Sequence, residues 1–296
     1  MSPSTRGAGV PSRHDRVTDP DLAAALLAAR RGTAYFARKL AELPDDDFAG
    51  PSLLPGWTRA HVIAHVGYNA RALTRLLEWA ATGVPAPMYA SPQHRAAEIQ
   101  DGATLSPIAL QHLVTHAAVH LNVEWRDLPA HCWSRPVRTA QGRTVPVSAT
   151  AWLRSREVWI HAVDLDNGAG FRDFPPDLLD GLLADVTGAW GARRVGTDLV
   201  LRPTDRAVRF PAGGPGARAV GVPGSRGAGS PSVGVPAARA AGGIGVLTAG
   251  DGPGEAGPRG IEIVGSAADL ARWATGRGSG GVTGPAGAPP PVPRWL

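Results

Sequence analysis

The sequence contains a single cysteine, Cys132, among 296 residues. One cysteine excludes an internal disulfide bond and a zinc site built from several cysteines. No apolar run approaches the roughly 18 residues of a membrane-spanning helix, and residues 1–16 lack the apolar segment of a secretory signal. We therefore expect a reduced, cytoplasmic protein that does not associate with membranes.

Lys39 is the only lysine in the sequence, whereas arginine is abundant. The formal net charge is +5. A basic protein can bind nucleic acid, but that function is typical of clustered Lys and Arg or of a recognisable binding module. Here the arginines are spread along the chain, and we find no such module. We expect no nucleic-acid partner.

The first half of the chain has the periodicity of a helical protein. Residues 1–16 are rich in Ser, Gly, Pro and Arg and are predicted to be a disordered tail. Apolar residues then recur at helical spacing, bounded by capping and stop signals. The predicted helices cover residues 21–43, 58–81, 106–126 and 148–166. Four such helices predict an all-α four-helix bundle over residues 17–168, a fold that builds metal sites from inward-facing side chains.

The second half predicts a smaller α+β domain over residues 169–278. A helix at 175–194 is followed by short strands at 198–203, 207–210 and 261–264 and by a helix at 266–275. Between them, residues 212–260 consist mainly of Gly, Pro, Ala and Arg, which predicts a long flexible insertion. Residues 279–296 are again rich in Gly and Pro and are predicted to be a C-terminal tail.

Glu157 and His161 are the most informative pair in the sequence. They are four residues apart in a predicted helix, so both side chains lie on one face. A carboxylate in so apolar a helix needs a partner, which a metal ion or an arginine could provide. A histidine from a facing helix, either His61 or His65, could complete a three-ligand site. Three ligands leave a coordination position open, as in catalytic rather than structural metal sites.

Other polar residues have more than one interpretation. Three histidines at helical spacing, His112, His116 and His120, have no accompanying carboxylate, and we interpret them as a partly exposed helix face rather than a second site. Asn69 lies one turn after His65. It is a candidate contact for a cofactor or substrate, or support for a ligand; the alternative is an ordinary surface residue.

At this point the chain resembles a known family, the mycothiol-dependent maleylpyruvate isomerases of the wider DinB-like metal-binding helical superfamily. The resemblance covers about 17–210 and 261–296. It rests on Leu54–His65 (LPGWTRAHVIAH), Tyr68–Ala70, Met88–Pro92, Ala97–Ala103, Pro136–Pro146, Arg156–Asp164 (REVWIHAVD), Ala268–Arg277 (ADLARWATGR) and the Trp-Leu ending. Residues 212–260 have no recognised counterpart.

The resemblance implies residue roles. Zinc, or another divalent cation, would be held by His65, Glu157 and His161, with His65 favoured over His61 because the family's ligand is the last histidine of its motif. Arg277 would be the catalytic arginine. The alternative for Arg277 is a cation that satisfies the last carbonyls of a helix.

The resemblance also implies a reaction: maleylpyruvate is converted to fumarylpyruvate during gentisate-type degradation of aromatic compounds. A thiolate adds to the cis double bond, the new single bond rotates, and elimination gives the trans isomer. Cys132 shows no sign of activation, so the thiol is expected to be mycothiol, activated in the open zinc position. The expected partners are mycothiol and a small dicarboxylate, and we expect a monomer.

Two other functions remain open. A mycothiol S-transferase would use the same metal and thiol but release the adduct. A non-catalytic metal-binding protein of the stress response would need neither thiol nor turnover. The long insertion favours the second slightly, because it could disturb the small domain near Arg277.

Overall fold

The computed structural model describes residues 15–213 and 260–295. The predicted tail at 1–16 and the predicted insertion at 212–260 therefore lie outside the described residues, apart from positions 15 and 16 of the tail and 212, 213 and 260 of the insertion. No helix in the described ranges combines the length and the apolar character that a membrane crossing requires.

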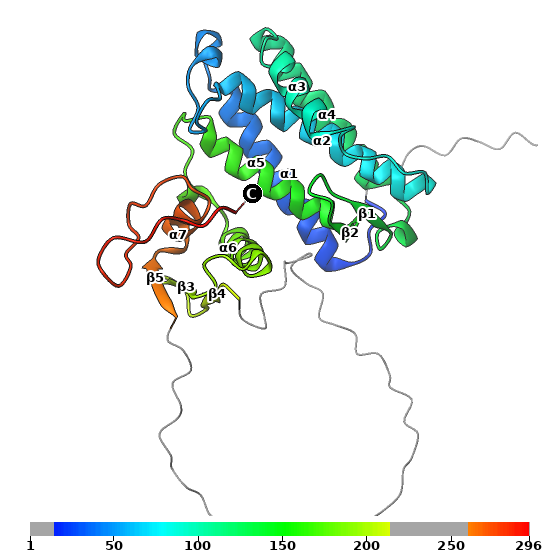
Figure 1. Ribbon diagram of the computed structural model, residues 1–296. Coiled ribbons are helices and arrows are strands. Elements are labelled where there is room, and N and C mark those ends of the chain that lie inside the picture. The colour runs from blue at the N-terminus through cyan, green and yellow to red at the C-terminus, as the bar shows by residue number, and fades with distance from the viewer. Residues whose placement is uncertain (1–14, 214–259, 296) are drawn as a thin grey trace, which may run out of the picture.

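Four long helices form the N-terminal bundle: α1 (Pro20–Ala41), α2 (Arg59–Thr82), α4 (Pro107–Asp127) and α5 (Ala149–Asp164). The closest pairs are α2 with α4 and α1 with α5, and α2 also contacts α5 (Figure 1). This arrangement confirms the predicted fold class for the first half. The contact between α2 and α5 matters most, because it joins the two segments that carry the candidate ligands.

The bundle helices begin and end at local signals in the sequence. The Asp19 carboxylate accepts hydrogen bonds from two N–H groups at the start of α1, and Pro20 follows as the first helical residue. The Thr58 hydroxyl caps α2 in the same way. Gly83 ends α2 with φ = 77°, a left-handed conformation that glycine adopts without strain.

Several shorter elements were not predicted from the sequence. These are the helix α3 (Pro92–Gly102), the 3₁₀ helices η1 (Asp45–Ala49), η2 (Ala130–Cys132) and η3 (Phe171–Asp173), and the hairpin of β1 (Pro136–Arg138) and β2 (Thr144–Pro146). Only Ile99 and Gly102 of α3 are buried, so its apolar periodicity is too weak to detect. Its start is nevertheless marked by the Ser91 cap and Pro92.

The smaller second part contains α6 (Pro176–Arg193), β3 (Leu199–Pro203), β4 (Phe210–Pro211), β5 (Ile261–Gly265) and α7 (Ala267–Ala274). The strand order is β4-β3-β5; β3 is antiparallel to β4 and parallel to β5, with Leu201 opposite Ile263. Figure 1 shows this part on the α5 side of the bundle. The presence of this small sheet with its two helices beside the bundle confirms the predicted fold class, a helical bundle with a smaller α+β region.

One apolar cluster runs through both parts of the molecule. Its members from α5, α6 and α7 include Trp152, Trp159, Leu182, Trp190 and Trp273. The predicted C-terminal tail also contributes, because Trp295 is buried and its carbonyl accepts a hydrogen bond from Arg193. The boundary drawn at residues 168 and 169 stays a prediction. Hydrogen bonds from Arg277, just after α7, to Asp164, the last residue of α5, place the end of α7 close to α5.

The close contact between α1 and α5 depends on Gly32. A Cβ added there would lie 2.5 Å from Trp159 Nε1 and 2.6 Å from Val158 Cγ2, both in the core. Gly32→Ala should therefore destabilise the fold by roughly 1–3 kcal/mol through overpacking, as measured by urea unfolding. Gly170→Ala is the matched control, since a Cβ there meets nothing within 4 Å. Equal stability of the two variants would contradict this packing.

Candidate metal centre and its cavity

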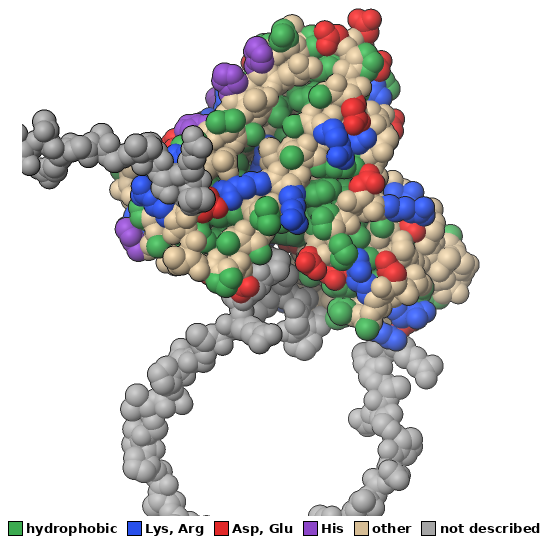
Figure 2. All heavy atoms as spheres, turned by 180° about the vertical axis from the view of Figure 1, so that it is seen from behind, with side chains coloured by type: hydrophobic (Ala, Val, Ile, Leu, Met, Phe, Trp, Pro, Cys, Tyr) green, Lys and Arg blue, Asp and Glu red, His purple; other side chains and the backbone are tan. Residues whose placement is uncertain are grey.

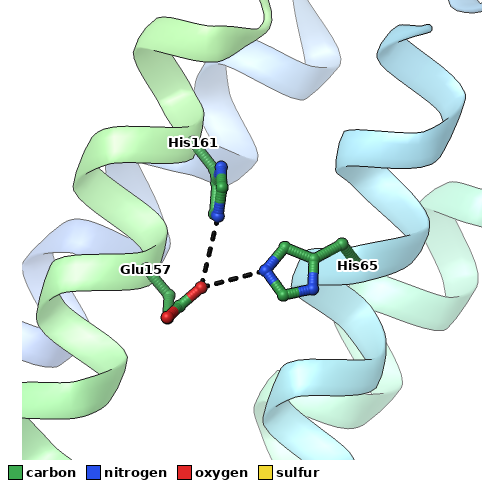
Figure 3. A group of neighbouring side chains, drawn as sticks. All are labelled: His65, Glu157 and His161. Atoms are coloured by element: carbon green, nitrogen blue, oxygen red, sulfur yellow. Dashed lines mark hydrogen bonds and ion pairs between the residues drawn. The ribbon is translucent and has the colours of Figure 1, made fainter. Parts of the chain in front are cut away.

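The three candidate ligands meet between α2 and α5. His65 projects from α2, while Glu157 and His161 project from successive turns of α5 (Figure 3). One ligand atom from each lies within 4.8 Å of the others. His65 Nε2 is 3.0 Å and His161 Nε2 is 3.2 Å from Glu157 Oε2. The structure thus brings together the group that the sequence predicted; the ligand roles themselves stay predictions.

The structure separates His61 from His65. The ring of His61 is turned to the start of α2, where Nδ1 accepts a hydrogen bond from the Thr58 N–H at 3.2 Å. Its Nε2 lies 3.1 Å from Gln100 Oε1. His61 therefore stabilises the helix end, and His65, only 5% exposed, is the histidine that faces Glu157.

Burial and hydrogen bonding set the protonation states of the group. Burial lowers the pKa of His65 to about 4. Burial alone would raise the pKa of Glu157, but hydrogen bonds from His161 and His65 outweigh it and hold the pKa well below its usual range. Burial alone would lower the pKa of His161, but its hydrogen bonds to Asp164 and Glu157 outweigh burial and raise that pKa. At neutral pH the group thus offers an ionised carboxylate and a neutral His65 imidazole, whereas His161 holds its proton more strongly than a free imidazole and gives it up when it binds a divalent cation.

Asp164 contacts the side of His161 that faces away from Glu157. The sequence analysis assigned no role to Asp164. It is fully buried at the end of α5, and its Oδ2 is 2.8 Å from His161 Nδ1. Burial alone would raise the pKa of Asp164, but hydrogen bonds from His161 and Arg277 outweigh burial and lower that pKa. A carboxylate on the far nitrogen orients a ligating histidine. The spacing of three residues from His161 is the signal that could have identified it.

Arg277 lies at the same carboxylate, three residues after α7 ends. Its Nε and Nη2 donate to Asp164 Oδ1 and Oδ2 at 3.0 and 2.7 Å, and its Nη1 donates to the Thr275 carbonyl. A guanidinium has five N–H donors. Two of them are thus left after these bonds, and Arg277 lines the cavity beside the metal group.

A cavity of about 1220 Å³ opens onto the three candidate ligands. Among the described residues that line it, Glu157 is the only carboxylate. The lining also contains five arginines: Arg95, Arg138, Arg156, Arg277 and Arg294. Two of them are paired with carboxylates outside the lining, Arg156 with Asp185 and Arg277 with Asp164, whereas Arg95 and Arg138 form no ion pair with the described residues. This remaining positive charge favours an anionic ligand.

The remaining residues singled out in the sequence lie as follows. Asn69 is buried and lines the cavity. His112, His116 and His120 are exposed on α4, as the sequence interpretation expected, and Figure 2 shows histidines along one edge of the helical part. On the same face acidic and basic side chains are interspersed. Cys132 is buried and does not line the cavity.

The chain is similar to known proteins in both sequence and structure. The family model of the mycothiol maleylpyruvate isomerase N-terminal domain matches residues 29–166. An uncharacterized protein of Mycobacterium tuberculosis, found in strains CDC 1551 / Oshkosh and H37Rv, is 30% identical over 139 residues, which are 44% of this chain and 51% of that protein. The chain thus spans about half the length of these curated relatives.

Two solved structures are similar over nearly the whole chain. One is a crystal structure of the mycothiol-dependent maleylpyruvate isomerase, with 41% identity and a TM-score of 0.75 over 93% of this chain and 97% of that one. The other is a histidine-to-alanine mutant of the same enzyme, with 40% identity and the same coverage and TM-score. With this identity over almost all of a solved relative, the chain belongs to the family of mycothiol-dependent maleylpyruvate isomerases.

Proposed function

We propose that this protein catalyses the mycothiol-dependent cis–trans isomerisation of maleylpyruvate to fumarylpyruvate. The observation that carries the proposal is the joint placement of the ligand group and Arg277 on one cavity, linked through the buried Asp164. The reaction would serve gentisate-type degradation of aromatic compounds in the cytoplasm.

The donor set fits a divalent cation, and we propose zinc. Two imidazole nitrogens point at one carboxylate oxygen, and the second nitrogen of His161 is bonded to Asp164. Such a set is typical of zinc sites that keep one position open for a ligand. When bound there, zinc would acidify a thiol, so that it reacts as the thiolate at neutral pH.

The thiol comes from outside the chain, because Cys132 is buried away from the cavity. In such a reaction the thiolate of the external thiol would add to one alkene carbon, and the electron pair of the double bond would move onto the conjugated carbonyl oxygen as an enolate. After rotation about the single bond, the enolate would collapse, the C–S bond would break, and the same thiolate would be released. The two N–H groups of Arg277 that remain after its bonds to Asp164 and Thr275 would bind a carboxylate or the enolate oxygen.

The test is an absorbance assay of the zinc-loaded protein with maleylpyruvate, with and without mycothiol. We expect conversion to fumarylpyruvate only when mycothiol is present, with the free-thiol concentration unchanged. Consumption of one thiol per substrate would instead identify an S-transferase. Absence of turnover under both conditions would point to a non-catalytic metal-binding protein. Either result overturns the proposal.

A further inference from the structure

Arg154 is a buried cation that the proposed reaction does not use. It lies on α5, one turn before Glu157, and is 1% exposed. Its Nη1 donates to the Val66 carbonyl at 2.8 Å and to Asn69 Oδ1 at 3.0 Å. Its Nε and Nη2 have no hydrogen-bond partner among the described residues, and the charge of Glu157 offsets only part of the penalty of burying the guanidinium. A buried charge left in this state is costly unless an anion offsets it.

The bond to Arg154 fixes the orientation of the Asn69 amide. A guanidinium only donates, so the amide must turn its oxygen to Arg154. Its nitrogen then faces the other way. Asn69 lines the cavity whereas Arg154 does not, and Asn69 Nδ2 makes no hydrogen bond to the described residues. The cavity is therefore presented with an N–H donor one helical turn from His65, on the same face of α2.

We propose that Asn69 and Arg154 form a subsite that binds an acceptor oxygen of the reacting ligand beside the metal group. Asn69 Nδ2 is the donor, and Arg154 is the positioning residue that prevents the amide from flipping. The inference rests on the proposed function. The oxygen belongs either to a carboxylate of the substrate or to a carbonyl of the thiol, and the experiment distinguishes these sources.

A purely structural role for the pair is the competing explanation, because the Arg154–Asn69 bond also joins α2 to α5. Two variants of Asn69 separate the explanations. Asn69→Asp keeps an oxygen for Arg154, and so keeps the helix–helix link, but presents the cavity with an acceptor instead of a donor. Asn69→Ala removes the donor without adding charge.

We expect both variants to retain zinc, and Asn69→Asp to melt no lower than the wild type. The KM of one ligand, maleylpyruvate or mycothiol, should rise by about 10-fold in Asn69→Ala and by about 100-fold in Asn69→Asp, as for a lost hydrogen bond to a charged group. The ligand whose KM rises provides the oxygen. Arg154→Met should raise the same KM, because the Asn69 amide loses the bond that orients it and is free to flip. Wild-type KM values for both ligands in Asn69→Ala would overturn the subsite.

A binding measurement separates failure of the subsite from failure of the proposed function. Calorimetry with maleate, as a dicarboxylate probe, and with mycothiol is carried out on the zinc-loaded wild type and on Asn69→Ala. Weaker binding of one probe to the variant supports the subsite even when the wild type turns over no maleylpyruvate. Equal binding of both probes, or no binding to the wild type, overturns it.

Discussion

His65→Ala should lose zinc and isomerase turnover together, whereas His61→Ala should keep both. His65 Nε2 is 3.0 Å from the Glu157 oxygen that His161 also faces, so its removal leaves two of the three ligands. Loss of an outer-shell partner already costs about 10- to 100-fold in metal affinity, and loss of a ligand should cost more. The measurement is zinc content after dialysis, with turnover measured in parallel.

His61→Ala is the matched control, because it removes the same side chain from the same helix one turn earlier. His61 is bonded to Thr58 and Gln100, so the variant should lose about 1 kcal/mol of stability from a weakened helix cap while its zinc content is unchanged. Stoichiometric zinc in His65→Ala would remove His65 from the ligand set. Zinc loss in His61→Ala alone would move the site to the first turn of α2.

These two histidines show which features of the site are local in sequence. The pairing of Glu157 with His161 follows from helical spacing alone, so it could be predicted. The choice between His61 and His65 could not be made from spacing, because both lie on one helix face; the family resemblance favoured His65. The structure adds a physical reason, since the His61 ring is already bonded at the start of α2.

The residues that the sequence did not reveal depend on contacts between distant segments. Arg154 has its side-chain partner on α2, and Asp164, besides its local contact with His161, is bonded to Arg277 from the segment after α7. The same holds for α3, which has few buried residues of its own and packs on α2 through Gly102. Capping and periodicity identified the long helices because those signals are local; tertiary contacts determine the rest.

Arg277→Ala should lower kcat/KM by about 10²–10³-fold while zinc stays bound, as expected when a group that stabilises developing negative charge is removed. Arg277 contacts no ligand atom of the metal group directly; its bonds are to Asp164 and Thr275. Zinc content and turnover should therefore separate in this variant, unlike in His65→Ala. Arg272→Ala, in the same segment but outside the cavity lining, is the control and should keep wild-type turnover.

Removal of Arg277 has a second consequence, because it leaves the buried Asp164 with His161 as its one remaining charged partner. Arg277→Lys isolates the catalytic role. The ammonium still neutralises Asp164, so stability and zinc should be preserved, but a lysine lacks the planar fork that can hold Asp164 on one edge and a ligand carboxylate on the other. Turnover should then fall by at least about 10-fold. Full turnover in Arg277→Lys would mean that Arg277 acts only by compensating Asp164, and that the two spare N–H groups do not bind the substrate.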